Sequence, residues 1–190
     1  MKTKQIIITT YITTAAVVIT LIVLILINYK RMKQSIQGTV GKSYFTIDEL
    51  CASQTAKRRG INNNPSDEVR TNLQRLIDQV LNPARQAYGS YIRVTSGYRC
   101  PALNAAVGGA ASSQHLTGQA ADITTGNIST DRQLFALLVS QAHFDQLIWE
   151  QTKNGRWIHV SYAPQHRQQI LAYNGKHYTN IKANWQTAIA

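Results

Sequence analysis

The feature that most constrains this chain is a long apolar run close to its amino terminus. From Ile6 to Ile27 there is no charged residue, no Pro and no Gly, and the few polar residues are mostly Thr. About 20 helical residues at 1.5 Å each cross a hydrocarbon core of roughly 30 Å. We therefore predict a transmembrane helix over residues 6–28, which we call the anchor, after a short basic amino terminus at residues 1–5.

A cleaved signal peptide is the main alternative for this run. The apolar core of a signal peptide usually has about 7 to 15 residues and is followed by small residues at the cleavage site. Here the run is longer, and residues 28–33 read NYKRMK. These features favour an uncleaved anchor, while the sequence leaves open whether cleavage occurs. Basic residues flank the run on both sides, so charge alone does not decide its orientation.

The net charge of the chain is unevenly distributed. The 190 residues carry +11, from 20 Lys and Arg against nine Asp and Glu. Six of the basic residues precede the first acid, Asp48, which leaves 14 basic residues against nine acids, or +5, for residues 43–190. We predict a basic linker at 29–43 and a folded domain at 44–190. Nucleic-acid binding is disfavoured, because anionic lipid headgroups are a sufficient partner for basic residues beside an anchor.

Helix signals come first in the folded domain and strand signals come later. The capping-box pattern from Thr46 to Glu49 starts a short helix, and an apolar stripe after Pro65 predicts a longer helix that Pro83 interrupts. Further helices are expected at 101–107 and 130–140, and strands at 91–96, 119–124, 144–150, 156–162, 168–173 and 177–181. Asn-Gly pairs at 154–155 and 174–175 predict two hairpins. The order indicates an α+β fold, with helices packed on a small antiparallel sheet.

The two cysteines, Cys51 and Cys100, allow either one disulfide or two free thiols, and the sequence does not decide between these states.

A hydrolytic zinc site needs three nitrogen or oxygen ligands, an open position for water, and a base. His115 ends a loop of small residues, and Asp122 lies seven residues later in a predicted strand. His159 is expected on one face of a later strand, and Glu150 would lie on the partner strand of the same hairpin. These four residues are the candidate metal site.

Three segments resemble the zinc D-alanyl-D-alanine carboxypeptidases and related peptidoglycan endopeptidases, a family that shares its zinc site with hedgehog domains. Residues 113–122 read SQHLTGQAAD and match the zinc signature S-x-H-x-x-G-x-A-x-D. Residues 157–159 are similar to the W-x-H element, and residues 96–99 to an S-G-Y-R segment. The similarity covers residues 45–162. The segment between Glu150 and His159 is longer here than is usual for the family. This departure from the family pattern concerns the assignment of Glu150 more than that of the ligands.

The resemblance implies a role for each matching residue. It makes His115, Asp122 and His159 the ligands of Zn2+ and Glu150 the general base that activates water. Arg99 would hold a substrate carbonyl or carboxylate and stabilise the oxyanion. Two further residues are expected beside the site: Ser113 hydrogen-bonds a ligand or caps the loop, and Trp157 lines the substrate cleft or is an ordinary aromatic on the exposed face of its strand.

The resemblance also implies a substrate and a location. The expected protein is a monomeric, zinc-dependent peptidase that hydrolyses a peptidoglycan stem peptide, with its catalytic domain on the periplasmic or extracellular side and its amino terminus in the cytoplasm. D-Ala-D-Ala carboxypeptidase and L-Ala-D-Glu endopeptidase activities both occur in the family, and a phage lysis enzyme would have a similar sequence. The alternative function is a non-catalytic zinc module that binds cell wall or protein.

Overall fold

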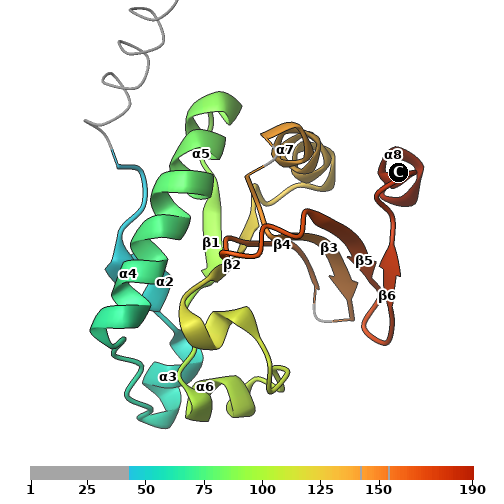
Figure 1. Ribbon diagram of the computed structural model, residues 1–190. Helices are drawn as coiled ribbons and strands as arrows, with labels where there is room; N and C mark the ends of the chain where they lie inside the picture. Colours follow the sequence, from blue (N-terminus) through green and yellow to red (C-terminus); the bar gives the residue numbers. More distant parts are fainter. Residues whose placement is uncertain (1–42, 142, 154) are drawn as a thin grey trace, which may run out of the picture. The chain divides into compact units, whose positions relative to one another are not determined.

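The computed structural model describes residues 43–141, 143–153 and 155–190 (Figure 1). The predicted anchor and nearly all of the predicted linker lie outside these residues. Within the part of the chain that is described, no helix is both long enough and apolar enough to cross a membrane.

The secondary structure follows the predicted order. The helices are α2 (Ile47–Cys51), α3 (Gln54–Arg59), α4 (Asp67–Leu76), the π-helical η1 (Ile77–Leu81), α5 (Asn82–Tyr88), α6 (Pro101–Ala106), the 3-10 helix η2 (Gln114–Thr117), α7 (Ile128–Gln141) and α8 (Trp185–Ala188). The strands are β1 (Arg93–Ser96), β2 (Ala120–Thr124), β3 (Gln146–Thr152), β4 (Gly155–Ser161), β5 (Gln169–Tyr173) and β6 (Tyr178–Asn180). The α+β class is therefore confirmed.

The sheet is mixed, so the predicted antiparallel sheet is wrong in one pairing. The six strands lie in the order β1-β2-β4-β3-β5-β6, and every neighbouring pair is antiparallel except β3 and β5 (Figure 1). Strand β4 ends beside the start of β3, where Val160 pairs with Leu147. From there the chain crosses to the free edge of β3 and places Gln169 opposite Gln146. Because β5 begins where β3 begins, the two strands run in the same direction.

Pro83 does not end the long helix, contrary to the sequence prediction. The chain continues from α4 through η1 into α5, and the N–H of Asn82 donates to the carbonyl of Ile77, five residues back. A proline removes a backbone donor, and its ring crowds the carbonyl four residues earlier. The wider π-helical turn that precedes Pro83 relieves this crowding and lets the helix run on to Tyr88.

The hydrophobic core lies between the helices and one face of the sheet. Leu134, Phe135 and Leu138 of α7 are fully buried, and the Phe135 ring meets Trp149 of β3 edge-on at 5.7 Å between ring centres. Paired residues of β4 and β2, such as Ile158 and Ile123, lie on this same face. Because side chains alternate along a strand, the residues between them project from the opposite face. Asp122, Glu150 and His159 are on that opposite face.

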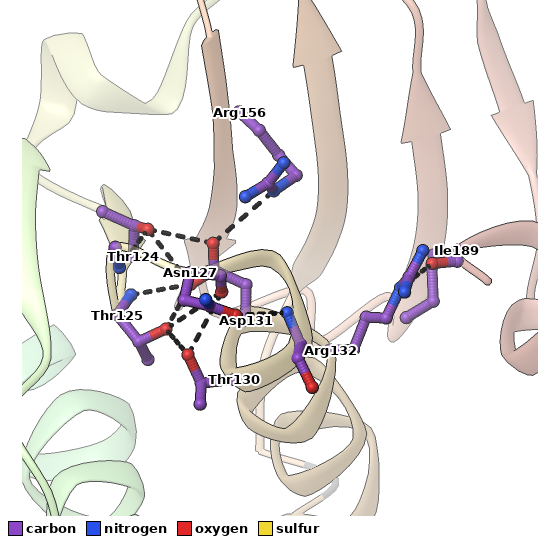
Figure 2. Close-up of polar contacts among 10 residues, drawn as sticks. Thr124, Thr125, Asn127, Thr130, Asp131, Arg132, Arg156 and Ile189 are labelled. Carbon is purple, nitrogen blue, oxygen red and sulfur yellow. Dashed lines mark hydrogen bonds and ion pairs between the residues drawn. The ribbon is translucent and has the colours of Figure 1, made fainter.

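A buried polar network joins the first turn of α7 to the sheet (Figure 2). The Asp131 carboxylate is fully buried and accepts hydrogen bonds from the Thr124 hydroxyl at 3.0 Å and the Thr125 N–H at 2.6 Å. Nε of Arg156, on β4, lies 3.6 Å from the same carboxylate. Asp131 therefore holds the end of β2, the start of α7 and β4 together.

Candidate metal centre

His115 is held in place by a backbone carbonyl. It lies in η2, where the Ser113 hydroxyl accepts a hydrogen bond from the His115 N–H, and its side chain is buried. Its Nδ1 lies 2.6 Å from the carbonyl oxygen of Gly97, which can only accept. The proton of the neutral ring is therefore on Nδ1, and Nε2 presents a lone pair.

Two further donor atoms converge on His115 Nε2. Asp122 Oδ1 and His159 Nδ1 each lie 3.2 Å from it, and they lie 3.0 Å from one another. The two residues come from neighbouring strands and are direct partners in the pairing of β2 with β4. The three residues form a group that could hold a metal ion, and all three are buried.

The spacing of these atoms fits a tetrahedral zinc ion. Ligand bonds of about 2.0 to 2.1 Å at tetrahedral angles separate the ligand atoms by roughly 3.3 Å. The three atoms also lack the hydrogens to bond one another fully. When both histidines are neutral, the proton of the His115 ring is on Nδ1 and faces Gly97, so at most one proton, on His159 Nδ1, lies between the three atoms. A bound cation would satisfy all three lone pairs at once, so the donor set fits zinc.

Electrostatics keep His115 and Asp122 in the states that bind a metal. Burial lowers the pKa of His115 and outweighs the opposing effect of the Asp122 carboxylate. Burial alone would raise the pKa of Asp122, but His115 and His159 lower it far below its ordinary range. Neutral imidazole and ionised carboxylate are the forms that coordinate a metal.

Glu150 lies on the same face of the sheet, one row away from the ligands. It pairs with Trp157 across the hairpin, and Trp157 and His159 are two residues apart on β4, so all three side chains share a face. Burial raises the pKa of Glu150 to about 7, and the charge of Asp122 acts in the same direction. His159, Arg99 and the Trp157 indole act in the opposite direction. Glu150 therefore lies beside the candidate metal site, although the segment between Glu150 and His159 is longer than is usual for the family.

Arg99 also reaches the site. Its Nη2 lies 4.0 Å from Asp122 Oδ2, and its backbone N–H donates to the carbonyl of His115. Its Nε is buried and has no hydrogen-bond partner among the described residues. This leaves a charged donor group available beside the ligands.

Sequence reasoning missed an ion pair between the buried Asp145 and the exposed Arg167 that supports η2. Asp145, at the start of β3, accepts a hydrogen bond from Gln114 at 2.8 Å and two-pronged hydrogen bonds from Arg167. Burial opposes ionisation of Asp145, but the hydrogen bonds from Arg167 and Gln114 lower its pKa to about 2. The residues on either side of Arg167, His166 and Gln168, have φ of 43° and 50°, in the left-handed region. No local sequence pattern identifies Gln114 as part of this network. It is next to His115 in the sequence, but its side chain donates to Asp145, just before β3.

The other predicted features are placed as follows. Ser113 acts as the cap of η2, and Trp157 lies next to Glu150, with its indole acting on the Glu150 carboxyl. Cys51 and Cys100 are both free thiols. Asn63 links their segments, since its side chain donates to the carbonyl of Cys51 and accepts from the N–H of Cys100.

A comparison with known protein families finds a match for the part of the chain that contains the candidate site. Residues 43–161 match the family model Peptidase M15, and this segment includes the three candidate ligands, Glu150 and Arg99. The chain belongs to the Peptidase M15 family. The predicted resemblance is thereby confirmed, and membership in Peptidase M15 indicates a metal-dependent peptidase. A search of curated proteins found no match. Residues 162–190 of this Peptidase M15 member, including β5 and β6, lie outside the matched segment.

Proposed function

We propose that the protein is a zinc-dependent peptidase that hydrolyses an amide bond in the stem peptide of peptidoglycan. The observation that carries this proposal is the convergence of His115, Asp122 and His159 within 3.2 Å of one another, with Glu150 on the same face. When bound, zinc would supply a Lewis acid that polarises a carbonyl and lowers the pKa of water. The anchor would hold the protein at the cytoplasmic membrane, with this domain on the outer side, where the wall lies.

Glu150 and Arg99 perform the remaining chemistry. Glu150 takes a proton from the attacking water and gives it to the leaving nitrogen. A pKa raised to about 7 suits a group that must both accept and donate a proton near neutral pH, and a bound cation would lower that pKa by its charge. Arg99 donates to the substrate oxygen on which negative charge develops. Both the D-Ala-D-Ala bond and the L-Ala-D-Glu bond are suitable substrates for this machinery.

The test uses the full chain in mild detergent, loaded with zinc, and a synthetic stem peptide that contains both bonds. Mass spectrometry of the products identifies which bond is cut. The Glu150→Gln variant should bind zinc as the wild type does, but should lose about 10²- to 10⁴-fold in turnover, because only the proton-transfer group is removed. The exposed Asp78→Asn variant is the matched control and should retain full activity.

A zinc-loaded wild-type protein that leaves both the peptide and intact peptidoglycan uncut would contradict the proposal. Such a result would favour the non-catalytic binding module instead.

A further inference from the structure

The C-terminal hairpin of β5 and β6 extends the metal-binding face of the sheet. Glu150 of β3 pairs with Tyr173 of β5, and Tyr173 pairs in turn with Tyr178 of β6. Paired residues on neighbouring strands project from the same face and lie about 5 Å apart at Cβ. The two tyrosines therefore continue the row that Trp157 and Glu150 begin.

The two tyrosine rings are stacked face to face, and we call this pair the tyrosine wall. Their centres are 4.4 Å apart, and their planes are inclined by only 24°. Tyr178 lies on an edge strand and is 58% exposed, whereas Tyr173 is partly buried beneath it. Burial raises the pKa of Tyr178, and the charges of Glu150, Tyr173 and Asp122 add to this, so the phenol stays protonated at neutral pH.

The position of the tyrosine wall relative to Glu150 indicates which part of a substrate it meets. Arg99 and the metal ligands lie on the β1, β2 and β4 side of Glu150, while the wall lies on the β5 and β6 side. Glu150 can protonate the leaving nitrogen only if that nitrogen is within about 3 Å of its carboxylate. A substrate with its carbonyl at the ligands and its nitrogen at Glu150 therefore continues over the tyrosines.

We propose that Tyr178, supported by Tyr173, is a substrate-binding residue that contacts the amine-bearing leaving part of the peptide. This inference rests on the proposed peptidase function and names the part of the substrate that residues outside the family match would recognise. Aromatic rings that are held rigidly by a stacked neighbour lose little entropy on binding, and tyrosine is among the residues that contribute most to binding energy.

The test compares three variants of the full zinc-loaded chain with the stem peptide as probe. Tyr178→Ala should raise KM about fivefold to tenfold, as expected when an interface tyrosine contributes somewhat more than 1 kcal/mol. Zinc content and kcat should change little. Tyr178→Phe keeps the ring and should stay within about twofold of wild type. Tyr91→Ala removes a tyrosine that is also exposed but precedes β1, and should have no effect.

Product inhibition distinguishes the leaving side from the acyl side. Tyr178→Ala should weaken inhibition by the amine-bearing product and leave inhibition by the carboxyl-bearing product unchanged. Equal effects on both products, or the same kinetics as Tyr91→Ala, would overturn the inference. The thermal midpoint of each variant shows whether the fold is intact.

Calorimetry separates this inference from the proposed function. The uncut stem peptide is titrated into the Glu150→Gln protein with and without Tyr178→Ala. Weaker binding in the double variant supports substrate contact by Tyr178 even if the wild type cleaves nothing, an outcome that would overturn the peptidase proposal alone. Cleavage by the wild type combined with equal binding by both proteins would overturn the tyrosine wall alone. An absence of both cleavage and binding would overturn both.

Discussion

At the scale of single residues, the candidate metal site depends on a glycine that is not one of its candidate ligands. The carbonyl of Gly97 accepts a hydrogen bond from the Nδ1–H of His115 and so sets the tautomer of that ring. The next residue, Tyr98, donates its N–H to the carbonyl of Leu50 in α2 at 2.7 Å. Gly97 is thus packed against the backbone of α2 while it orients a ligand.

Replacing Gly97 tests this double role. A Cβ at this position would lie 2.1 Å from the carbonyl oxygen of Leu50, so Gly97→Ala must displace the backbone that holds His115. We expect zinc affinity to fall at least about tenfold, as for other losses of an outer hydrogen bond to a ligand, together with a lower thermal midpoint. Zinc titration measures the first effect and thermal unfolding the second.

Gly60→Ala is the control for this prediction. A Cβ at Gly60 meets no atom within 4 Å, although φ of +61° makes alanine unfavourable there. This variant should lose about 1 kcal/mol of stability and bind zinc normally. Equal zinc affinity in the two variants would show that Gly97 does not orient His115.

The sequence pattern could predict some residues of the candidate site but not all of their roles. The candidate ligands could be picked out because His115 and Asp122 occupy a recognisable local motif, and because the alternation of a strand places His159 on one face. Gly97 could be recognised only as part of the S-G-Y-R segment. Its role as a hydrogen-bond acceptor depends on a contact between residues 18 positions apart.

At the scale of elements, local signals predicted where helices and hairpins start. Thr46 accepts the N–H of Glu49, as its capping pattern predicts. Both Asn-Gly pairs lie at connections between adjacent antiparallel strands. The break expected at Pro83 failed because a π-helical turn accommodates the proline, and this depends on buried side chains such as Ile77 and Leu81 that hold both helical halves on the core.

The junction of β2 with α7 depends on Asp131, and its removal should be costly. Asp131→Ala deletes the acceptor for Thr124 and Thr125 and leaves the partly buried Arg156 without its carboxylate (Figure 2). Breaking a buried charged pair in this way costs about 3 kcal/mol or more. Denaturant unfolding of the variant should show this loss.

Asp78→Ala is the matched control, because Asp78 is exposed and bonds only to Gln74 among the described contacts. It should change the free energy of unfolding by less than about 0.5 kcal/mol. Similar losses in the two variants would contradict a structural role for the Asp131 network.

At the scale of the whole molecule, Asp145 joins segments that are far apart in the chain. It connects the start of β3 to Gln114 beside the metal ligand and to Arg167 in the crossing before β5. The connection holds His166 and Gln168 in left-handed backbone conformations, each of which costs about 1 kcal/mol or more. The crossing places β5, and with it the tyrosine wall, beside Glu150.

The contribution of Asp145 to stability should depend on pH. Its pKa falls from the ordinary 3.8 to about 2 in the folded protein, so the folded state favours the ionised form. The resulting stabilisation, on the order of 2 kcal/mol, is present above about pH 4 and is lost as the pH falls through about 2. Asp145→Asn should therefore be less stable than wild type at pH 7, and the difference should shrink toward zero near pH 2.

Denaturant unfolding at several pH values measures this dependence, with Asp78→Asn as the control that differs little from wild type throughout. A gap between Asp145→Asn and wild type that stays constant from pH 7 to pH 2 would show that the carboxylate charge is not what stabilises the crossing.

Local patterns were enough to predict the α+β class, most element positions and the residues that form the candidate metal site, because caps, turns and strand alternation act over a few neighbouring residues. Local patterns could not predict the parallel pairing of β3 with β5, because this pairing depends on which edge of the sheet is free when β4 ends. The same long-range choice places Tyr173 and Tyr178 next to Glu150. Contacts of this kind are set by how distant segments pack together, and only the folded structure reveals them.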